Sequence, residues 1–207
     1  MTDSVRFHFD PLCPWCYQTS RWVQRLAELG EITVDWAVFS LEIVNAGSAE
    51  SAQKGHARSE PGLRTVIAVR DAEGADAVGR FYAALGAAVH QRGEAVDDHA
   101  TIARALTEAN LAPELLDKAL ADDSTWIAVQ DEHRALVDGT RSFGVPTIVL
   151  DGGDGPAIFG PVISDPPDGD ADAVELWHHV AWLTRYENFS ELKRERSIQP
   201  DLPSFRR

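Results

Sequence analysis

The chain has only two cysteines, and both lie in one short motif, Cys13-Pro14-Trp15-Cys16. Residues 5–9, just before the motif, alternate in the manner of a strand, and apolar side chains recur at helical spacing over residues 15–29. A strand is therefore expected to end just before the motif, and a helix to begin at it. This junction constrains the fold more than any other feature of the sequence.

The helix start gives the two cysteines different chemistry. Unpaired backbone N–H groups and the positive end of the helix dipole stabilise a thiolate at Cys13, and the fixed φ of Pro14 suits a first helical turn. Cys16 lies almost one turn later, where its sulfur can resolve a mixed disulfide. We expect Cys13 to be the nucleophile, with a pKa below the ordinary value of about 8.5, and Cys16 to be the resolving thiol.

The motif is also compatible with three roles that involve no thiol exchange. A structural disulfide is one, although closing so short a loop removes little chain entropy. A zinc site is another, but it needs further ligands. Because the chain has no second cysteine pair and no finger-like histidine spacing, no metal site is expected. The two thiols can also be incidental.

The rest of the chain shows strand patterns on either side of a long Ala- and Leu-rich segment with helical periodicity. In chain order the expected elements are a strand over 32–39, a loop over 40–57 that can cover a site, several helices over 63–143 with breaks near 74, 93, 112–113 and 122–123, a hairpin of strands 147–150 and 157–159, a helix over 172–186, and an extended surface tail after 198.

This order of elements predicts an α/β fold. A strand, a helix and a strand normally form a parallel sheet with a right-handed crossover. Together with the later hairpin and helix, they match a thioredoxin-like fold with an inserted all-helical domain. We expect residues 1–60 and 144–207 to form the two parts of the core, and residues 61–143 to form the helical insertion.

The composition limits the partners and the cellular compartment expected for such a fold. A content of 44% hydrophobic and 25% charged residues is typical of a globular protein. The formal net charge of -14 disfavours nucleic acid and anionic membrane surfaces as partners. The N-terminus lacks the pattern of a signal peptide, no run of about 18 apolar residues occurs, and the few cysteines suit a reducing compartment. We therefore expect a cytoplasmic protein.

A second feature lies just before the strand at 147–150, in Gly144-Val145-Pro146-Thr147. Most X-Pro bonds are trans, but a proline at this place in thioredoxin-like folds is cis. If it is cis here, Pro146 lies against the cysteines. The backbone of Val145 is then expected to be exposed, so that it can pair with a substrate segment or a thiol.

The chain resembles the DsbA-like branch of the thioredoxin superfamily and, more narrowly, the mycothiol-dependent nitroreductases of actinobacteria. The motifs that carry the resemblance are Phe9-Asp10-Pro11-Leu12-Cys13-Pro14-Trp15-Cys16, Thr19-Ser20-Arg21-Trp22, Gly144-Val145-Pro146-Thr147, Phe159-Gly160-Pro161-Val162 and Glu191-Leu192-Lys193-Arg194.

The resemblance implies a dithiol that passes electrons to nitroaromatic or disulfide acceptors. Mycothiol or another low-molecular-weight thiol recycles it, with help from a mycoredoxin or thioredoxin-type protein and with no tightly bound cofactor. Carried over by position, Trp15 stacks beside the acceptor, while Asn45 and His90 face the cysteines. The family often carries an aromatic residue in the loop after Asn45. In this chain residues 49–55 occupy that place, and none of them is aromatic. The implied binding set is Pro14, Trp15, Asn45, His90, Val145 and Pro146.

Two other classes of function remain open. Kappa-class glutathione transferases and hydroxychromene-carboxylate isomerases share the architecture but typically have serine at the position of Cys13. A thiol-dependent isomerase or transferase would use a bound thiol without a protein disulfide cycle. A non-catalytic binding module or holdase would use only the cleft under the helical domain.

Overall fold

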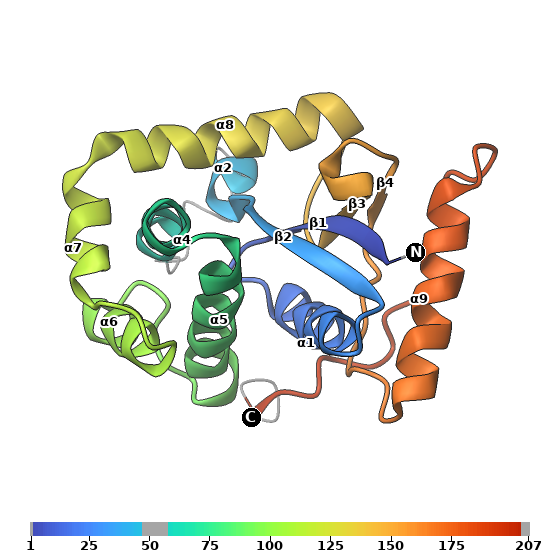
Figure 1. Cartoon of the computed structure of the whole chain (residues 1–207), viewed down its shortest axis with the longest axis horizontal. Helices are drawn as coiled ribbons and strands as arrows, with labels where there is room; N and C mark the ends of the chain where they lie inside the picture. Colours follow the sequence, from blue (N-terminus) through green and yellow to red (C-terminus); the bar gives the residue numbers. More distant parts are fainter. Residues whose placement is uncertain (1, 47–57, 204–207) are drawn as a thin grey trace.

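The computed structural model describes residues 2–46 and 58–203, and Figure 1 shows a central sheet between layers of helices. Its elements, in chain order, are β1 (Asp3–Phe9), α1 (Pro14–Glu28), β2 (Ile32–Val38), α2 (Leu41–Asn45), α4 (Glu60–Glu73), α5 (Ala75–Gly86), the π-helical turn η1 (Ala87–Gln91), α6 (His99–Glu108), α7 (Glu114–Ala121), α8 (Asp123–Thr140), β3 (Thr147–Leu150), the 3-10 turn η2 (Asp151–Gly153), β4 (Ala157–Phe159) and α9 (Asp170–Arg185).

The sheet has the strand order β2-β1-β3-β4. β1 runs parallel to β2 and antiparallel to β3, and β3 pairs antiparallel with β4. The expected β-α-β unit and the expected hairpin are thus confirmed. The central pair, β1 and β3, joins segments from the two ends of the chain.

The alternation of side chains along β1 divides the molecule into layers. Phe9 stacks on Tyr82 of α5 at a centroid distance of 3.7 Å, while Arg6 and His8 point to the other face, where α8 crosses the sheet. On α1, the fully buried Trp22 donates a hydrogen bond to the Ala173 carbonyl in α9 at 3.0 Å. Helix α1 is therefore fixed between the sheet, α5 and α9.

Helices α4 to α8 form the insertion between β2 and β3, as expected. The predicted breaks all fall between helices. Gly74, for example, has a φ of 85° between α4 and α5, and the side chain of Asp122 caps α8. The boundaries at 60/61 and 143/144 stay predictions. No helix in the described residues is long and apolar enough to cross a membrane.

The expected loop over residues 40–57 is wrong in its first part, where the short helix α2 forms. The Ser40 side chain accepts a hydrogen bond from the backbone N–H of Ile43 at 3.2 Å, and Glu42 lies in the positively polarised first turn. These two interactions favour a short helix at this position. Residues 47–57 lie outside the described residues. They include residues 49–55, where the family often carries an aromatic residue.

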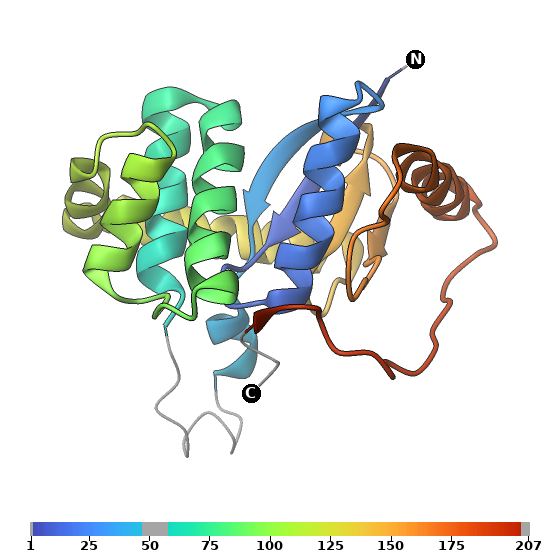
Figure 2. The same ribbon diagram turned by 90° about the horizontal axis from the view of Figure 1, so that it is seen from below.

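The C-terminal tail returns along the molecule from α9 to the start of α1 (Figure 2). An extended tail over the surface is expected after residue 198, but part of the described tail is buried. Pro200 is buried, and Leu202 is only 1% exposed. The tail is therefore packed against the body of the protein.

Candidate active site

The motif forms the start of α1 as predicted. Cys13 is the N-cap residue, Pro14 lies in the first turn, and the Sγ atom of Cys13 accepts a hydrogen bond from the backbone N–H of Cys16 at 3.3 Å. Both cysteines are free thiols, 6% and 0% exposed. The Cys13 sulfur is thus held over the helix start, and the Cys16 sulfur is enclosed by the protein.

The two thiols differ in acidity. A hydrogen bond from the Cys16 side chain, aided by the backbone N–H groups of Cys16 and Trp15, lowers the pKa of Cys13, although burial opposes this. Burial raises the pKa of Cys16 well above its ordinary value, and its interactions with Cys13 add to the effect. Of the pair, Cys13 therefore ionises first, while Cys16 keeps its proton.

The Val145–Pro146 peptide bond is cis, as expected, and lies next to the dithiol. The carbonyl oxygen of Val145 is 3.7 Å from the Sγ atom of Cys13. The expectation of an exposed Val145 backbone is wrong for this state, since the residue is 6% exposed and its carbonyl faces the sulfur.

A second cis proline supports this loop. The Gly160–Pro161 bond is cis, and the backbone N–H of Gly160 donates to the Pro146 carbonyl at 2.8 Å. On the other side, the Thr19 hydroxyl donates to the Pro161 carbonyl at 2.8 Å, which ties the loop to α1. The sequence alone does not predict that Gly160 and Pro161 support the loop of Pro146.

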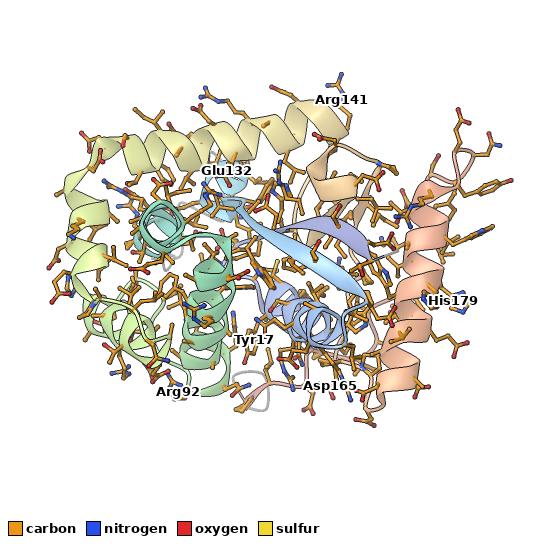
Figure 3. The ribbon with its side chains drawn as sticks, viewed as in Figure 1. Tyr17, Arg92, Glu132, Arg141, Asp165 and His179 are labelled. Atoms are coloured by element: carbon orange, nitrogen blue, oxygen red, sulfur yellow. The ribbon has the colours of Figure 1, made fainter. Side chains whose placement is uncertain are left out.

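His90 hydrogen-bonds to the turn before the motif and, among the described residues, to neither cysteine. Its Nε2 atom is 2.8 Å from the Pro11 carbonyl, and its ring stacks on Tyr17 at 5.3 Å. Figure 3 shows Tyr17 where α1 meets α5. Burial lowers the pKa of His90 to about 4, so at neutral pH the ring is neutral and its single proton must be on Nε2 to donate to Pro11.

The other two residues carried over from the family lie at the surface. Asn45 ends α2 with an exposed side chain, and in the described structure it makes no hydrogen bond to either cysteine. Trp15 is half-buried against the core, and the guanidinium carbon of Arg196 lies 5.4 Å from its ring centroid. The structure therefore gives Trp15 a neighbour that the sequence does not predict.

A buried carboxylate near the cysteines is also missed by sequence reasoning. Asp10 is fully buried and accepts hydrogen bonds from the backbone N–H groups of Leu12 and Leu41, at 2.8 and 2.7 Å, and from the Ser59 hydroxyl at 2.9 Å. Burial nevertheless raises its pKa to about 6. Its charge also raises the pKa of both cysteines. The sequence signal that could have pointed to Asp10 is its position as an acidic residue directly after a buried strand.

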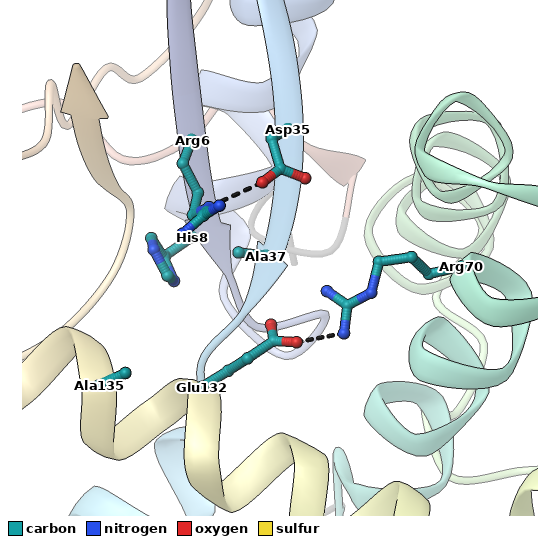
Figure 4. A pocket seen from close by; sticks show the side chains of 7 residues that line it. All are labelled: Arg6, His8, Asp35, Ala37, Arg70, Glu132 and Ala135. Carbon is teal, nitrogen blue, oxygen red and sulfur yellow. Dashed lines mark hydrogen bonds and ion pairs between the residues drawn. The ribbon is translucent and has the colours of Figure 1, made fainter. Parts of the chain in front are cut away.

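A polar cavity of about 340 Å³ lies on the other face of the sheet, between β1, β2, α4 and α8 (Figure 4). Its charges pair with one another: Arg6 with Asp35 at 2.7 Å, and Arg70 with Glu132. We therefore take the dithiol, and not this cavity, as the candidate active site.

Solved structures establish the fold of this site. The chain is similar to the cytosolic disulfide reductase DsbM from Pseudomonas aeruginosa, with a TM-score of 0.63 and 16% identity over 86% of this chain and 99% of that one. The probable DsbA oxidoreductase SCO1869 from Streptomyces coelicolor gives a TM-score of 0.59 and 16% identity over 94% of each chain. These structures show that the chain has a DsbA-like thioredoxin fold, with its dithiol at the start of α1.

The family within this fold class follows from sequence. The family model described as mycothiol-dependent nitroreductase Rv2466c matches residues 12–194, so the chain belongs to the Rv2466c-like family. It is also 37% identical to the uncharacterized protein Rv2286c of Mycobacterium tuberculosis, over 94% of this chain and 83% of that protein. The resemblance inferred from the motifs is confirmed, and the chain is an oxidoreductase.

Proposed function

We propose that this chain is a mycothiol-dependent reductase of nitroaromatic or disulfide acceptors that works in the cytoplasm. The observation that carries the proposal is the unequal pair of thiols, with Cys13 acidified at the helix start and Cys16 buried behind it. The family description supports mycothiol as the thiol. The confinement of both cysteines to the reactive motif supports a reducing compartment.

With a disulfide acceptor, the reaction takes two exchanges. The Cys13 thiolate attacks one sulfur, a mixed disulfide forms, and the first acceptor thiolate leaves and takes up a proton. Cys16 then loses its proton and attacks the Cys13 sulfur, which releases the second acceptor thiol. Two electrons have passed from the dithiol to the acceptor, and the protein holds a Cys13–Cys16 disulfide.

With a nitro acceptor, the same two electrons and two protons convert the nitro group to a nitroso group and water. Two mycothiol molecules restore the dithiol. The first opens the Cys13–Cys16 disulfide, and the second releases the first as mycothiol disulfide. A mycoredoxin or thioredoxin-type protein can supply the same electrons.

The remaining predicted residues are proposed to bind the reactants. Pro14 and Trp15 form the surface between the cysteines, and Val145 and Pro146 form the facing loop. His90 holds the turn before Cys13 through Pro11. Asn45 is proposed to contact the thiol or acceptor when it is bound.

The test measures reduction of a nitroaromatic or disulfide acceptor, with mycothiol or glutathione as the electron donor. The wild type is compared with Cys13→Ser and Cys16→Ser, and thiol trapping with mass analysis identifies the state of each cysteine. We expect Cys13→Ser to abolish turnover and Cys16→Ser to accumulate a mixed disulfide at Cys13. Full activity in both variants rules the mechanism out.

The other two classes give different results in the same assay. An isomerase or transferase that uses a bound thiol tolerates Cys16→Ser with little loss. A binding module or holdase needs neither thiol, so it keeps its activity after Cys13 is alkylated in the folded protein and in a variant that lacks both cysteines.

A further inference from the structure

Arg196 lies over the ring of Trp15, the residue next to the resolving cysteine. The guanidinium carbon is 5.4 Å from the ring centroid, within the range of a cation–π interaction. Trp15 is half-buried and Arg196 is exposed. A cationic side chain therefore forms part of the outer surface at the dithiol.

The tail that carries Arg196 is fixed to α1 just beyond the cysteines. Gln18, fully buried on α1, donates to the carbonyls of Ser164 and Asp201 at 2.6 and 3.3 Å. The Ser164 hydroxyl donates to the Ile198 carbonyl at 2.9 Å, and Leu202 is buried. The position of Arg196 over the motif thus follows from a packed segment rather than from one surface contact.

Arg196 differs from the other arginines around α1, because no acidic residue in the described part of the chain pairs with it. Arg21 pairs with Asp165 at 3.4 Å, and Arg25 pairs with Asp170 at 2.7 Å. Within residues 2–46 and 58–203, the Arg196 guanidinium makes neither an ion pair nor a hydrogen bond. No residue in the described part of this chain, whose net charge is -14, therefore occupies the N–H donors of Arg196.

A free guanidinium that stacks on an aromatic ring offers planar donors suited to a carboxylate. The positive end of α1 lies at the same place, since Cys13 is its N-cap. Both features favour negative charge on whatever approaches the Cys13 sulfur.

We propose that Arg196 forms an anion-binding subsite of the active site, so that the acceptor reduced by the dithiol carries a carboxylate or similar negative group near its reacting atoms. This inference rests on the proposed function, since it specifies the acceptor of the same dithiol. Arg196 acts here as a specificity-determining residue of the binding step and takes no part in electron transfer.

The test compares two aromatic disulfides that differ in charge, the dianionic dithiobis-nitrobenzoate and the neutral dithiodipyridine. The rate constant of the reduced protein with each is measured by stopped flow across pH, so that rates are compared at full Cys13 ionisation. Arg196→Gln is set beside Arg194→Gln, which removes the same charge from an exposed residue of the same tail, and beside Arg196→Lys, which keeps the charge.

We expect Arg196→Gln to slow the dianionic reagent about three- to five-fold at low salt and to change the neutral one less than two-fold. Arg194→Gln should change neither, and Arg196→Lys should keep most of the preference. Equal loss with both reagents, no loss, or the same loss in Arg194→Gln overturns the subsite. A wild type whose Cys13 reacts with neither disulfide refutes the proposed function itself, which is a distinct result.

Discussion

The Sγ atom of Cys13 lies 3.7 Å from the carbonyl oxygen of Val145, a residue 132 positions further along the chain. The two halves of the site thus meet through a backbone atom, so the identity of the Val145 side chain matters less than the path of its loop. Thr147 fixes that path, because its hydroxyl donates to the Gly144 carbonyl at 2.8 Å.

Replacing Cys16 should change the acidity of Cys13. We expect Cys16→Ala to raise the pKa of Cys13, because the hydrogen bond from the Cys16 side chain is the largest cause holding it down. Cys16→Ser should raise it less, since its hydroxyl can donate to the same sulfur. The ultraviolet absorbance of the thiolate against pH measures both values, and a pKa unchanged in Cys16→Ala contradicts this role of the hydrogen bond.

Alkylation should distinguish the two thiols in the native protein. The rate at Cys13 should rise with pH and level off below the ordinary thiol value, because only the thiolate reacts. Cys16 should stay unmodified until the protein unfolds, since it is fully buried and holds its proton. Peptide mass mapping after timed labelling checks this, and equal labelling of both cysteines is the contrary result.

Asp10→Asn should affect both stability and thiol acidity. An amide cannot accept all three hydrogen bonds of the carboxylate, so we expect a loss of about 1–2 kcal/mol in the free energy of unfolding. Removal of the charge should also lower the pKa of Cys13 further. Urea unfolding and thiolate absorbance measure the two effects, and a Cys13 pKa that rises instead speaks against a direct effect of this charge.

Acidification should destabilise the fold between pH 6.5 and 4. Burial lowers the pKa of His8 and His90 from 6.5 to about 4, so the unfolded chain binds more protons in this window, and each imidazole costs up to about 3 kcal/mol as pH falls. Asp10, whose pKa is raised from 3.8 to about 6, acts in the opposite direction. Urea unfolding at several pH values should therefore show a steeper loss in Asp10→Asn than in the wild type.

Two glycines provide a test of packing around Tyr17. A Cβ atom at Gly86 would lie 2.3 Å from a ring carbon of Tyr17, whereas one at Gly139 in α8 would meet nothing within 4 Å. We expect Gly86→Ala to cost about 1–3 kcal/mol and Gly139→Ala to be neutral or to stabilise by up to about 1 kcal/mol. Thermal unfolding of both variants is the measurement, and similar melting temperatures would show that Tyr17 moves aside freely.

Local patterns account for the features that sequence predicts well. The helix start at Cys13 depends on neighbouring residues, and the strand patterns give the β-α-β and hairpin units directly. The cis form of Pro146 is expected from its place before a strand in this fold. Such features need only short stretches of chain or a known topology.

The features that sequence does not predict depend on distant contacts. Asp10 accepts hydrogen bonds from Leu41 and Ser59, which lie 31 and 49 positions further along the chain. Arg196 contacts Trp15 from the opposite end of the chain. The helix α2 escapes prediction because it is only five residues long and the segment that follows it is rich in small and polar residues, although Ser40 is a good N-cap residue. The burial of Val145 likewise follows from how its loop packs against α1.

The insertion of α4 to α8 between β2 and β3 has a consequence for synthesis on the ribosome. A nascent chain that has emerged only through α8 already carries both cysteines and the whole helical insertion, but lacks Val145, Pro146 and the central partner of β1. Chains fold as they emerge, N-terminal parts first. The reactive sulfurs are therefore made long before the strand that completes their surroundings, and a cell that keeps new thiols reduced protects them during that interval.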